Sequence, residues 1–401
     1  MTVVMNNRFI SEKIYLCTLF IWVVVASLVT TTYFVRLDGF LSLYRLLLYF
    51  TIIMLLIKEL MNLSKTLYYF RFHWQQLLIV TAFFIAMFIV AKNRDGLLDI
   101  NVLLLVFSAR DIDFRKLLGT FSVATFLVLC LTIYASQKGM IANMFMNADG
   151  GYRFSLGFNY VSFASQRLFF ALCTYLMFRG KRISYPELLA LLLATIYMYQ
   201  QTSTSSPFYL SILILTYALL SIKIFKKEFI IGNFWSKALA QYGFIVALAV
   251  ILYFCFYSSG NLFHLVDQIT HNRLRLSVDG FRNFGVSWLG QPISFTTLDM
   301  FGNFTSNYNY IDSSFINVLI CYGILLFLFL LIGYTTIGSK AIEKNDQGLY
   351  VVLIIWGIHA MINPQIYLVW YNPFLFMFNM GCITKEIKKH YWIKKEKEKT
   401  I

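Results

Sequence analysis

The stretch HNRLRLSVDGFRNFG at 271–285 places three arginines, Arg273, Arg275 and Arg282, within ten residues. A fourth, Arg153, follows a glycine-rich turn in NADGGYRFSLGFN. A guanidinium group presents a planar fork of donors that matches phosphate oxygens, and such charge-assisted hydrogen bonds contribute about 1.5–3 kcal/mol each. The four arginines together therefore predict a site for an anion of the phosphate type.

A purely structural role is the alternative for each of these arginines. Ion pairs with Asp267, Asp279 and Asp299 are available in the same region, and long basic side chains also reach lipid headgroups. The relative direction of the Arg273 and Arg275 side chains depends on whether their R-x-R sequence is extended or helical. The two side chains share a face on an extended segment but diverge by about 200° on a helix.

Three more polar residues stand in or beside apolar segments. Arg167 lies deep in one of them, and an arginine at the centre of a span costs about 2.5–3.5 kcal/mol, so it is a functional candidate in the same anion site. His359, in WGIHAMINPQ, is either a hydrogen-bonded core residue or a general base. Asp312 heads DSSFINVLICYG and is either a helix N-cap or the base that accepts a hydroxyl proton.

Two amides are predicted to position a substrate, Asn159 in RFSLGFN and Gln291 in GQPIS. The Asp111-Ile112-Asp113 sequence is a D-x-D, which can hold a metal, but it stands among basic residues in the short segment RDIDFRK. The six cysteines all fall in apolar segments and show no metal-ligand spacing. We therefore expect no metal and no cofactor.

The elements that position these residues follow from composition. The mean hydropathy is +0.67 and only 13% of the residues are charged, against about 25% in soluble domains. A spanning helix needs about 20 mostly apolar residues. The chain is therefore predicted to be an all-α polytopic membrane protein in one integral membrane domain, residues 1–401. Its twelve apolar segments are 14–35, 41–57, 74–91, 97–109, 117–135, 158–178, 187–202, 207–222, 238–257, 315–334, 349–365 and 368–384.

The distribution of Lys and Arg predicts the orientation. With the N-terminus inside, 24 of the 34 basic residues fall in inner segments, as the positive-inside tendency requires. Both termini are then cytoplasmic, and residues 385–401 form a basic tail beside the membrane. Residues 258–314 form one large outer loop between the ninth and tenth spans, in which short amphipathic helices are expected. Because the net charge of +15 is mostly a topology signal, nucleic-acid binding is not expected.

In layout and in two motifs the chain resembles the Wzy-type polysaccharide polymerases, relatives of the O-antigen ligases. The layout is about twelve spans with a late, large outer loop that carries arginines. The motifs are RFSLGFN at 153–159 and DSSFINVLICYGI at 312–324. Many ligase-like members have His-Asn where this chain has Asp312-Ser313, so a catalytic histidine at that place is not implied.

The resemblance implies a GT-C-like fold and a metal-independent glycosyltransferase of the bacterial cytoplasmic membrane. Such enzymes join undecaprenyl-diphosphate-linked repeat units of capsule, exopolysaccharide or O-antigen on the outer face. The outer arginines would then contact the lipid diphosphate, with Asp312 or His359 as the base. Membrane lipids are expected partners, and the resemblance leaves open a chain-length regulator as a further one.

Two other classes remain as alternatives to a polymerase. A lipid-linked oligosaccharide flippase also needs a cationic cavity, but it predicts arginines along the spans, internal pseudo-symmetry and short loops. An O-antigen-type ligase or a membrane glycan acyltransferase is the second alternative. The acyltransferase class predicts an intramembrane histidine early in the chain, and the first nine apolar segments contain none.

Overall fold

The computed structural model describes residues 2–33, 39–63, 67, 74–94, 96–148, 151–224, 234–258, 260–297 and 308–379, and these are mostly helical. The α-helices are α1 (Thr2–Leu28), α2 (Phe40–Met61), α4 (Trp74–Asn93), α5 (Leu97–Ser108), α6 (Phe114–Gln137), α7 (Phe163–Arg179), α8 (Tyr185–Thr202), α9 (Ser205–Tyr217), α10 (Phe234–Phe256), α11 (Gly260–Ile269), α12 (Arg273–Phe284), α13 (Ser314–Asn317), α14 (Gly323–Glu343) and α15 (Gln347–Ile362). Short 3-10 helices are η2 (Ala109–Asp111), η3 (Gly180–Arg182) and η6 (Pro373–Asn379), and π-helical turns are η4 (Ala218–Ile224) and η5 (Val318–Tyr322). Strands β1 (Phe145–Ala148) and β2 (Gly151–Phe154) form an antiparallel hairpin.

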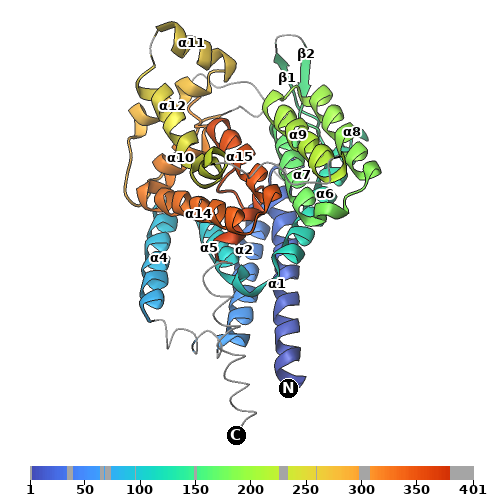
Figure 1. The fold of residues 1–401 in the computed structure, drawn as a ribbon, viewed down its shortest axis with the longest axis vertical. Coiled ribbons are helices and arrows are strands. Elements are labelled where there is room, and N and C mark those ends of the chain that lie inside the picture. Colours follow the sequence, from blue (N-terminus) through green and yellow to red (C-terminus); the bar gives the residue numbers. More distant parts are fainter. Residues whose placement is uncertain are drawn as a thin grey trace.

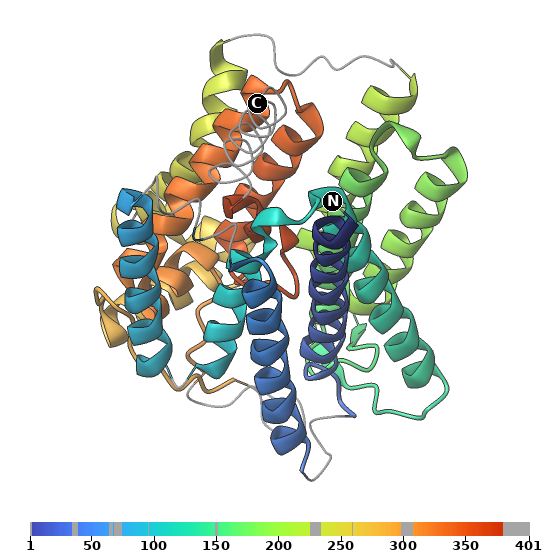
Figure 2. The same ribbon diagram turned by 90° about the horizontal axis from the view of Figure 1, so that it is seen from below.

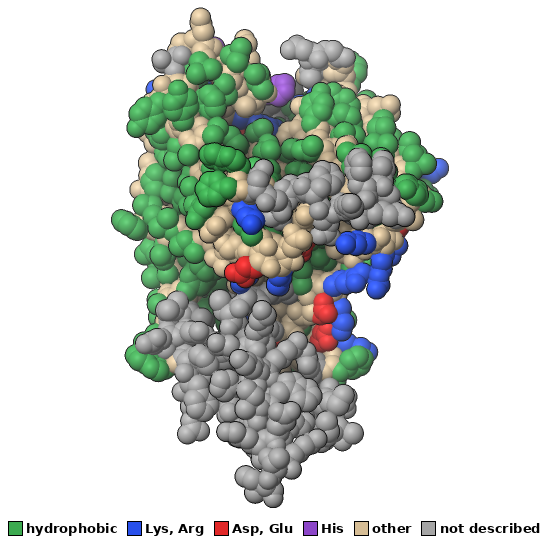
Figure 3. Space-filling view, viewed as in Figure 1, with side chains coloured by type: hydrophobic (Ala, Val, Ile, Leu, Met, Phe, Trp, Pro, Cys, Tyr) green, Lys and Arg blue, Asp and Glu red, His purple; other side chains and the backbone are tan. Residues whose placement is uncertain are grey.

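The chain is a multi-pass membrane protein. Five described helices are long and apolar enough to cross a bilayer: Phe9–Leu28, Phe40–Met61, Phe114–Gln137, Phe234–Phe256 and Ser314–Glu343. Large apolar side chains of α2, such as Leu41, Leu46 and Leu60, are exposed, which in water would be costly but in lipid is favourable. Figure 3 shows such hydrophobic side chains over much of the described surface.

The predicted segments and the observed helices agree along most of the chain. Each of the first eleven apolar segments coincides with a described helix, although α5 has only 12 residues and is short for a span. The twelfth differs, because its described part, residues 368–379, consists of turns and η6. Residues 380–384 and the predicted tail, 385–401, lie outside the described residues. The count of twelve spans therefore stays a prediction.

The helices form two groups (Figures 1 and 2). Helices α6 to α9 pack on one another on one side, α10, α14 and α15 pack on the other, and α1 contacts both α2 and α6. The β1–β2 hairpin and helices α11 and α12 lie at the same end of the molecule, at the top of Figure 1. The described part of the predicted 258–314 loop thus contains the two expected short helices, followed by irregular chain at 285–297 and 308–313.

The helix that follows this loop is broken. Helix α13 continues into the π-helical turn η5, and α14 starts afresh at Gly323, whose φ is +89°. A Cβ atom at Gly323 would lie 2.4 Å from the backbone nitrogen of Gly290. Only glycine fits, because both the backbone angle and the close approach exclude a side chain.

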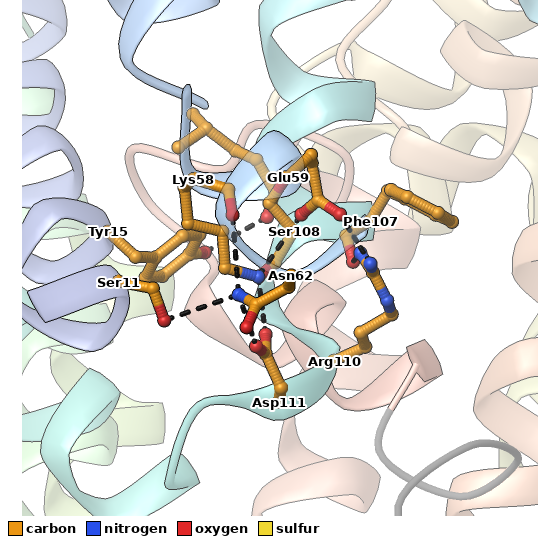
Figure 4. Close-up of polar contacts among 10 residues, drawn as sticks. Ser11, Tyr15, Lys58, Glu59, Asn62, Phe107, Ser108, Arg110 and Asp111 are labelled. Atoms are coloured by element: carbon orange, nitrogen blue, oxygen red, sulfur yellow. Dashed lines mark hydrogen bonds and ion pairs between the residues drawn. The ribbon is translucent and has the colours of Figure 1, made fainter. Parts of the chain in front are cut away.

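The end of the molecule that carries the N-terminus holds a buried charge cluster where α1, α2 and η2 meet (Figure 4). The Lys58 side chain is fully buried and donates to Asp111, to Ser108 O at 2.7 Å and to Glu59 Oε1 at 3.1 Å. Because Ser108 ends α5, its carbonyl has no partner within the helix and Lys58 satisfies it. Arg110 in turn donates to Glu59.

This cluster explains the D-x-D sequence without a metal. Asp111 accepts hydrogen bonds from Lys58 and from Asn62 Nδ2, the latter at 3.2 Å. Asp113 has a different task, because it is the N-cap of α6 and accepts from the backbone nitrogen of Arg115 at 2.8 Å. The two carboxylates serve separate structural contacts.

We predict that Asp111→Ala destabilises the protein more than Asp113→Ala. The first change leaves the buried Lys58 charge short of a partner and costs about 3 kcal/mol, at the low end for buried pairs because Asp111 is 37% exposed. The second removes one cap and costs about 1 kcal/mol. Thermal unfolding of the two purified variants in detergent measures the order. An equal loss of melting temperature in the two variants would contradict the structural role. A melting temperature of the wild type that depends on added divalent metal would contradict it as well.

Candidate functional site

Arg273 opens helix α12 and is the best-held of the predicted anion ligands. Its Nη1 atom donates to Ile362 O at 3.1 Å and to Asn363 Oδ1 at 3.0 Å. Its Nε atom lies 4.0 Å from Asp312 Oδ2, at the limit of an ion pair. The side chain remains 20% exposed, so the guanidinium is both fixed and accessible.

Helix α12 separates the arginines of the 271–285 stretch. Because Arg273 and Arg275 lie on a helix, their side chains diverge by about 200°, whereas Arg275 and Arg282 point in nearly the same direction. Arg275 and Arg282 are exposed, and the face that packs inward carries Leu274 and Ser277. The structure therefore does not bring all four predicted arginines together, and it leaves Arg275 and Arg282 away from Arg273.

Arg153 approaches from the other group of helices. It lies on β2, paired with Met146 of β1, and its Nε donates to Thr202 O at 2.8 Å while Nη2 donates to Thr204 Oγ1 at 3.3 Å. Burial lowers the pKa of its guanidinium, the nearby Tyr160 opposes this shift, and the positive charge of Arg273 lowers that pKa further. Two cations from distant segments thus act on each other across the site, which an anion between them would relieve.

Asp312 is not the predicted N-cap. The cap position of α13 is Ser313, and its side chain makes no capping hydrogen bond. The Asp312 side chain is 17% exposed and faces Arg273. Burial raises the pKa of its carboxyl above the ordinary value, an effect that Arg273 only partly offsets. A recessed, reachable carboxylate of this kind suits a general base.

His359 belongs to a closed ring of buried side chains. Its Nε2 is 2.9 Å from Gln365 Oε1, Gln365 Nε2 donates to Gln166 Oε1 at 2.6 Å, and Gln166 Nε2 donates to Asn363 Oδ1 at 3.1 Å. Asn363 Nδ2 closes the ring 3.4 Å from His359 Nδ1. Since the amide nitrogen can only donate, Nδ1 accepts and the neutral Nε2–H tautomer fits every contact.

The ring fixes Arg273 and encloses His359. Asn363 Oδ1 accepts from Gln166 and from Arg273 at once, so the ring orients the guanidinium. The His359 side chain is 1% exposed and lies between the rings of Phe169 and Phe170, with centroids 4.9 and 5.0 Å away. His359 is therefore a positioning residue in this structure.

Arg167 is fully buried, and its contacts are with other segments than those of Arg153. Its Nη1 donates to Ser27 Oγ at 2.7 Å, its Nη2 donates to Thr30 Oγ1 at 2.9 Å, and its guanidinium lies 4.5 Å from the Tyr371 ring. Its Nε atom is buried without a hydrogen-bond partner. These contacts connect the end of α1 to the segment after α15. They favour a structural role for Arg167 over a role in the anion site.

The two predicted positioning amides have structural contacts. The backbone nitrogen of Asn159 donates to Thr30 O at 2.9 Å, and its side-chain oxygen is buried without a hydrogen-bond partner. Gln291 Nε2 donates to Phe284 O and to Ile320 O, both at 3.1 Å. Ile320 lies in η5, next to the helix break, where freed carbonyls need donors. Gln291 thus supports the break and not the site.

Sequence reasoning missed the hub of the site, Asn363. The two amides at 363 and 365, which stand in an apolar run, are the signal of a buried polar network that could have located it. Among the described residues no group of three or more His, Cys, Asp or Glu side chains is placed to hold a metal ion. The site as described contains the guanidinium groups of Arg153 and Arg273, the carboxylate of Asp312 and the nearby Tyr160.

Comparison with protein-family models, with curated proteins and with solved structures gives no match for this chain. The site's own geometry therefore carries the functional argument.

We predict that Gln166→Leu disrupts the site by opening the ring. The change removes the acceptor of the buried Gln365 Nε2 and one of the donors to Asn363 Oδ1. Each lost hydrogen bond should lower the free energy of unfolding by about 1–3 kcal/mol. Gln137→Leu is the matched control, because Gln137 is exposed and bonds only at the surface to Tyr197. Thermal unfolding in detergent should show a clear loss for the first and little change for the second. Equal behaviour of the two variants would mean that the ring does not hold the site.

Proposed function

We propose that this protein is a polysaccharide polymerase that joins undecaprenyl-diphosphate-linked repeat units. The single observation that carries the proposal is that Arg273 lies 4.0 Å from the recessed carboxylate of Asp312, in a site where the charge of Arg153 also acts on Arg273. Two guanidiniums and one carboxylate leave a net positive charge of about one, which favours an anionic leaving group such as a diphosphate.

The residues suit glycosyl transfer to a hydroxyl group. In this reaction the acceptor oxygen forms a bond to the anomeric carbon as the bond from that carbon to the lipid diphosphate breaks. The hydroxyl proton passes to Asp312, and the electron pair leaves with the diphosphate. Arg153 and Arg273 stabilise the charge that develops there, and because their contacts are already in place, little reorganisation is needed.

The proposed setting is the outer face of the bacterial cytoplasmic membrane. In the proposed topology both termini are cytoplasmic, twelve segments span the bilayer, and residues 258–314 form the large outer loop. The placement of α11, α12 and the β1–β2 hairpin at one end of the molecule supports an asymmetric plan. Lipid-linked glycans are the proposed substrates, and a chain-length regulator is a proposed partner.

Deletion of the gene followed by gel analysis of the surface glycan separates polymerase from flippase. A polymerase defect reduces the ladder to a single exported repeat unit. A flippase defect leaves lipid-linked units inside the cell, and an unchanged ladder would refute both functions.

We predict that Arg273→Gln and Arg153→Gln each lower polymer formation about 100- to 1,000-fold, because each removes a donor to the leaving group. Lysine at either position should rescue poorly, since it lacks the bidentate fork. Arg275→Gln should have a much smaller effect, because Arg275 lies on the opposite, exposed face of α12. Polymer length on gels is the readout. A loss in Arg275→Gln as large as that in Arg273→Gln would contradict the assignment.

The raised pKa of Asp312 predicts the pH dependence of transfer. A base must be ionised, so activity should rise with pH through a value above the ordinary carboxyl range of about 4. Asp312→Asn should remove this limb of the profile along with most activity.

The same shift has a stability consequence. The folded protein disfavours ionisation of Asp312, since folding raises the pKa of its carboxyl. The protonated carboxyl therefore contributes to the free energy of unfolding at low pH, and this contribution is lost as the pH rises through the pKa of the folded state. We therefore expect Asp312→Asn to melt at a temperature equal to or above that of wild type at pH 7. A lower melting temperature would show that the carboxylate is needed for folding instead.

A further inference from the structure

A second Arg–Asp pair lies at the turn between α4 and α5. Arg94 Nε is 3.9 Å from Asp99 Oδ2, which is longer than a hydrogen bond. The two side chains are 23% and 12% exposed, so both are recessed and still reachable. The Nη1 atom of Arg94 is buried and has no hydrogen-bond partner.

Aromatic side chains enclose this pair. The guanidinium of Arg94 lies 3.4 Å from the centre of the Tyr322 ring, and Tyr322 contacts Tyr367 with ring centroids 4.5 Å apart. Tyr44 of α2 is close enough to Asp99 for the two to interact electrostatically. Tyr322 and Tyr367 are both buried, and Arg94 covers the Tyr322 ring. The aromatic rings therefore hold the guanidinium in place, and the partly exposed Arg94 and Asp99 side chains are left to meet a ligand.

The pair is connected to the first site through η5 and Tyr310. Asp312 lies two residues before the helical segment formed by α13 and η5, and Tyr322 ends that segment. The two residues are ten positions apart, which at 1.5 Å per residue corresponds to about 15 Å. Burial, followed by the charges of Asp312 and Tyr322, raises the pKa of Tyr310, which stands two residues before Asp312 in the chain. A ligand that reaches both places has to be longer than one sugar unit.

The charge at this second place distinguishes a sugar from a phosphate. The charges of Arg94 and Asp99 cancel. The first site has an excess positive charge, because it combines Arg153 and Arg273 with a single carboxylate, Asp312. A phosphate would be repelled by Asp99. A hydroxyl group beside the two side chains, in contrast, can donate to the carboxylate and accept from the guanidinium, and so bridge a pair whose 3.9 Å separation is too long for a direct hydrogen bond.

We propose that Arg94 and Asp99, with Arg94 held by Tyr322, form a subsite that binds the hydroxyl groups of a sugar residue about 15 Å from the transfer centre. The subsite rests on the proposed function in one respect, namely that the sugar belongs to the glycan being lengthened. The subsite would recognise a sugar residue of the donor or acceptor glycan that does not itself take part in the transfer.

The test uses the full-length protein purified in detergent. The first probe is the oligosaccharide released by mild acid from the surface glycan of cells that carry the gene, and the second is inorganic pyrophosphate. Arg94→Gln should weaken oligosaccharide binding at least tenfold and Asp99→Asn about five- to tenfold, since each loses a charge-assisted hydrogen bond. Both should bind pyrophosphate within about twofold of wild type, whereas Arg273→Gln should lose it.

Lys92→Gln is the matched control, because Lys92 is an exposed cation two residues from Arg94 in the last turn of α4. It should bind both probes as wild type does. Asp99→Asn keeps the shape of the side chain, so it tests the subsite even where Arg94→Gln melts early.

The outcomes separate the two proposals. Unchanged oligosaccharide affinity in Arg94→Gln and Asp99→Asn, with a glycan ladder that collapses only on gene deletion, refutes the subsite and leaves the polymerase standing. Loss of pyrophosphate binding in Arg94→Gln shows an anion site and overturns the sugar assignment. A wild-type protein that binds neither probe, with an unchanged ladder after deletion, refutes both.

Discussion

The site depends on one constraint, which is that every polar group buried among these apolar helices needs a partner. The ring of His359, Gln365, Gln166 and Asn363 meets this constraint with its own four side chains. In a medium without water an open member would cost several kcal/mol, so the ring holds one arrangement. One acceptor, Asn363 Oδ1, has capacity left, and it is the atom that receives Arg273. The position of the Arg273 guanidinium thus follows from the hydrogen bonding of the neutral amides that it contacts.

The same constraint explains the break between η5 and α14. The backbone nitrogens of Ile324 and Leu325 begin a new helix and donate to the carbonyls of Ser287 and Trp288, at 3.0 and 3.2 Å. The carbonyl of Ile320, freed by the π-helical turn, accepts from Gln291. A non-helical segment from the loop is therefore an integral part of the broken helix. Breaks of this kind within membrane proteins are tolerated only where protein supplies the missing partners.

The sequence predicted the parts of this structure that depend on local pattern. Apolar runs of the right length located the helices, and arginines outside those runs indicated the site. Contacts between distant segments were not predictable, because pattern does not show which segments meet: Asn363 bonds to Gln166, 197 positions away. The R-x-R spacing left the choice between strand and helix open, and the helix separates Arg275 from Arg273. Arg94 was not among the predicted site residues, because its partner Tyr322 is remote in the chain.

The crossing of Gly290 and Gly323 has a mechanical consequence. With no side chain between them, the two backbones touch, and neither can slide without carrying the other. Gly290 follows α12 by a few residues, and Gly323 directly follows Tyr322. If loading of Arg273 tilts α12, the contact between Gly290 and Gly323 would carry that movement to Tyr322, on whose ring the Arg94 guanidinium lies. Occupancy at one end should then alter affinity at the other, and by thermodynamic reciprocity the coupling runs equally in both directions.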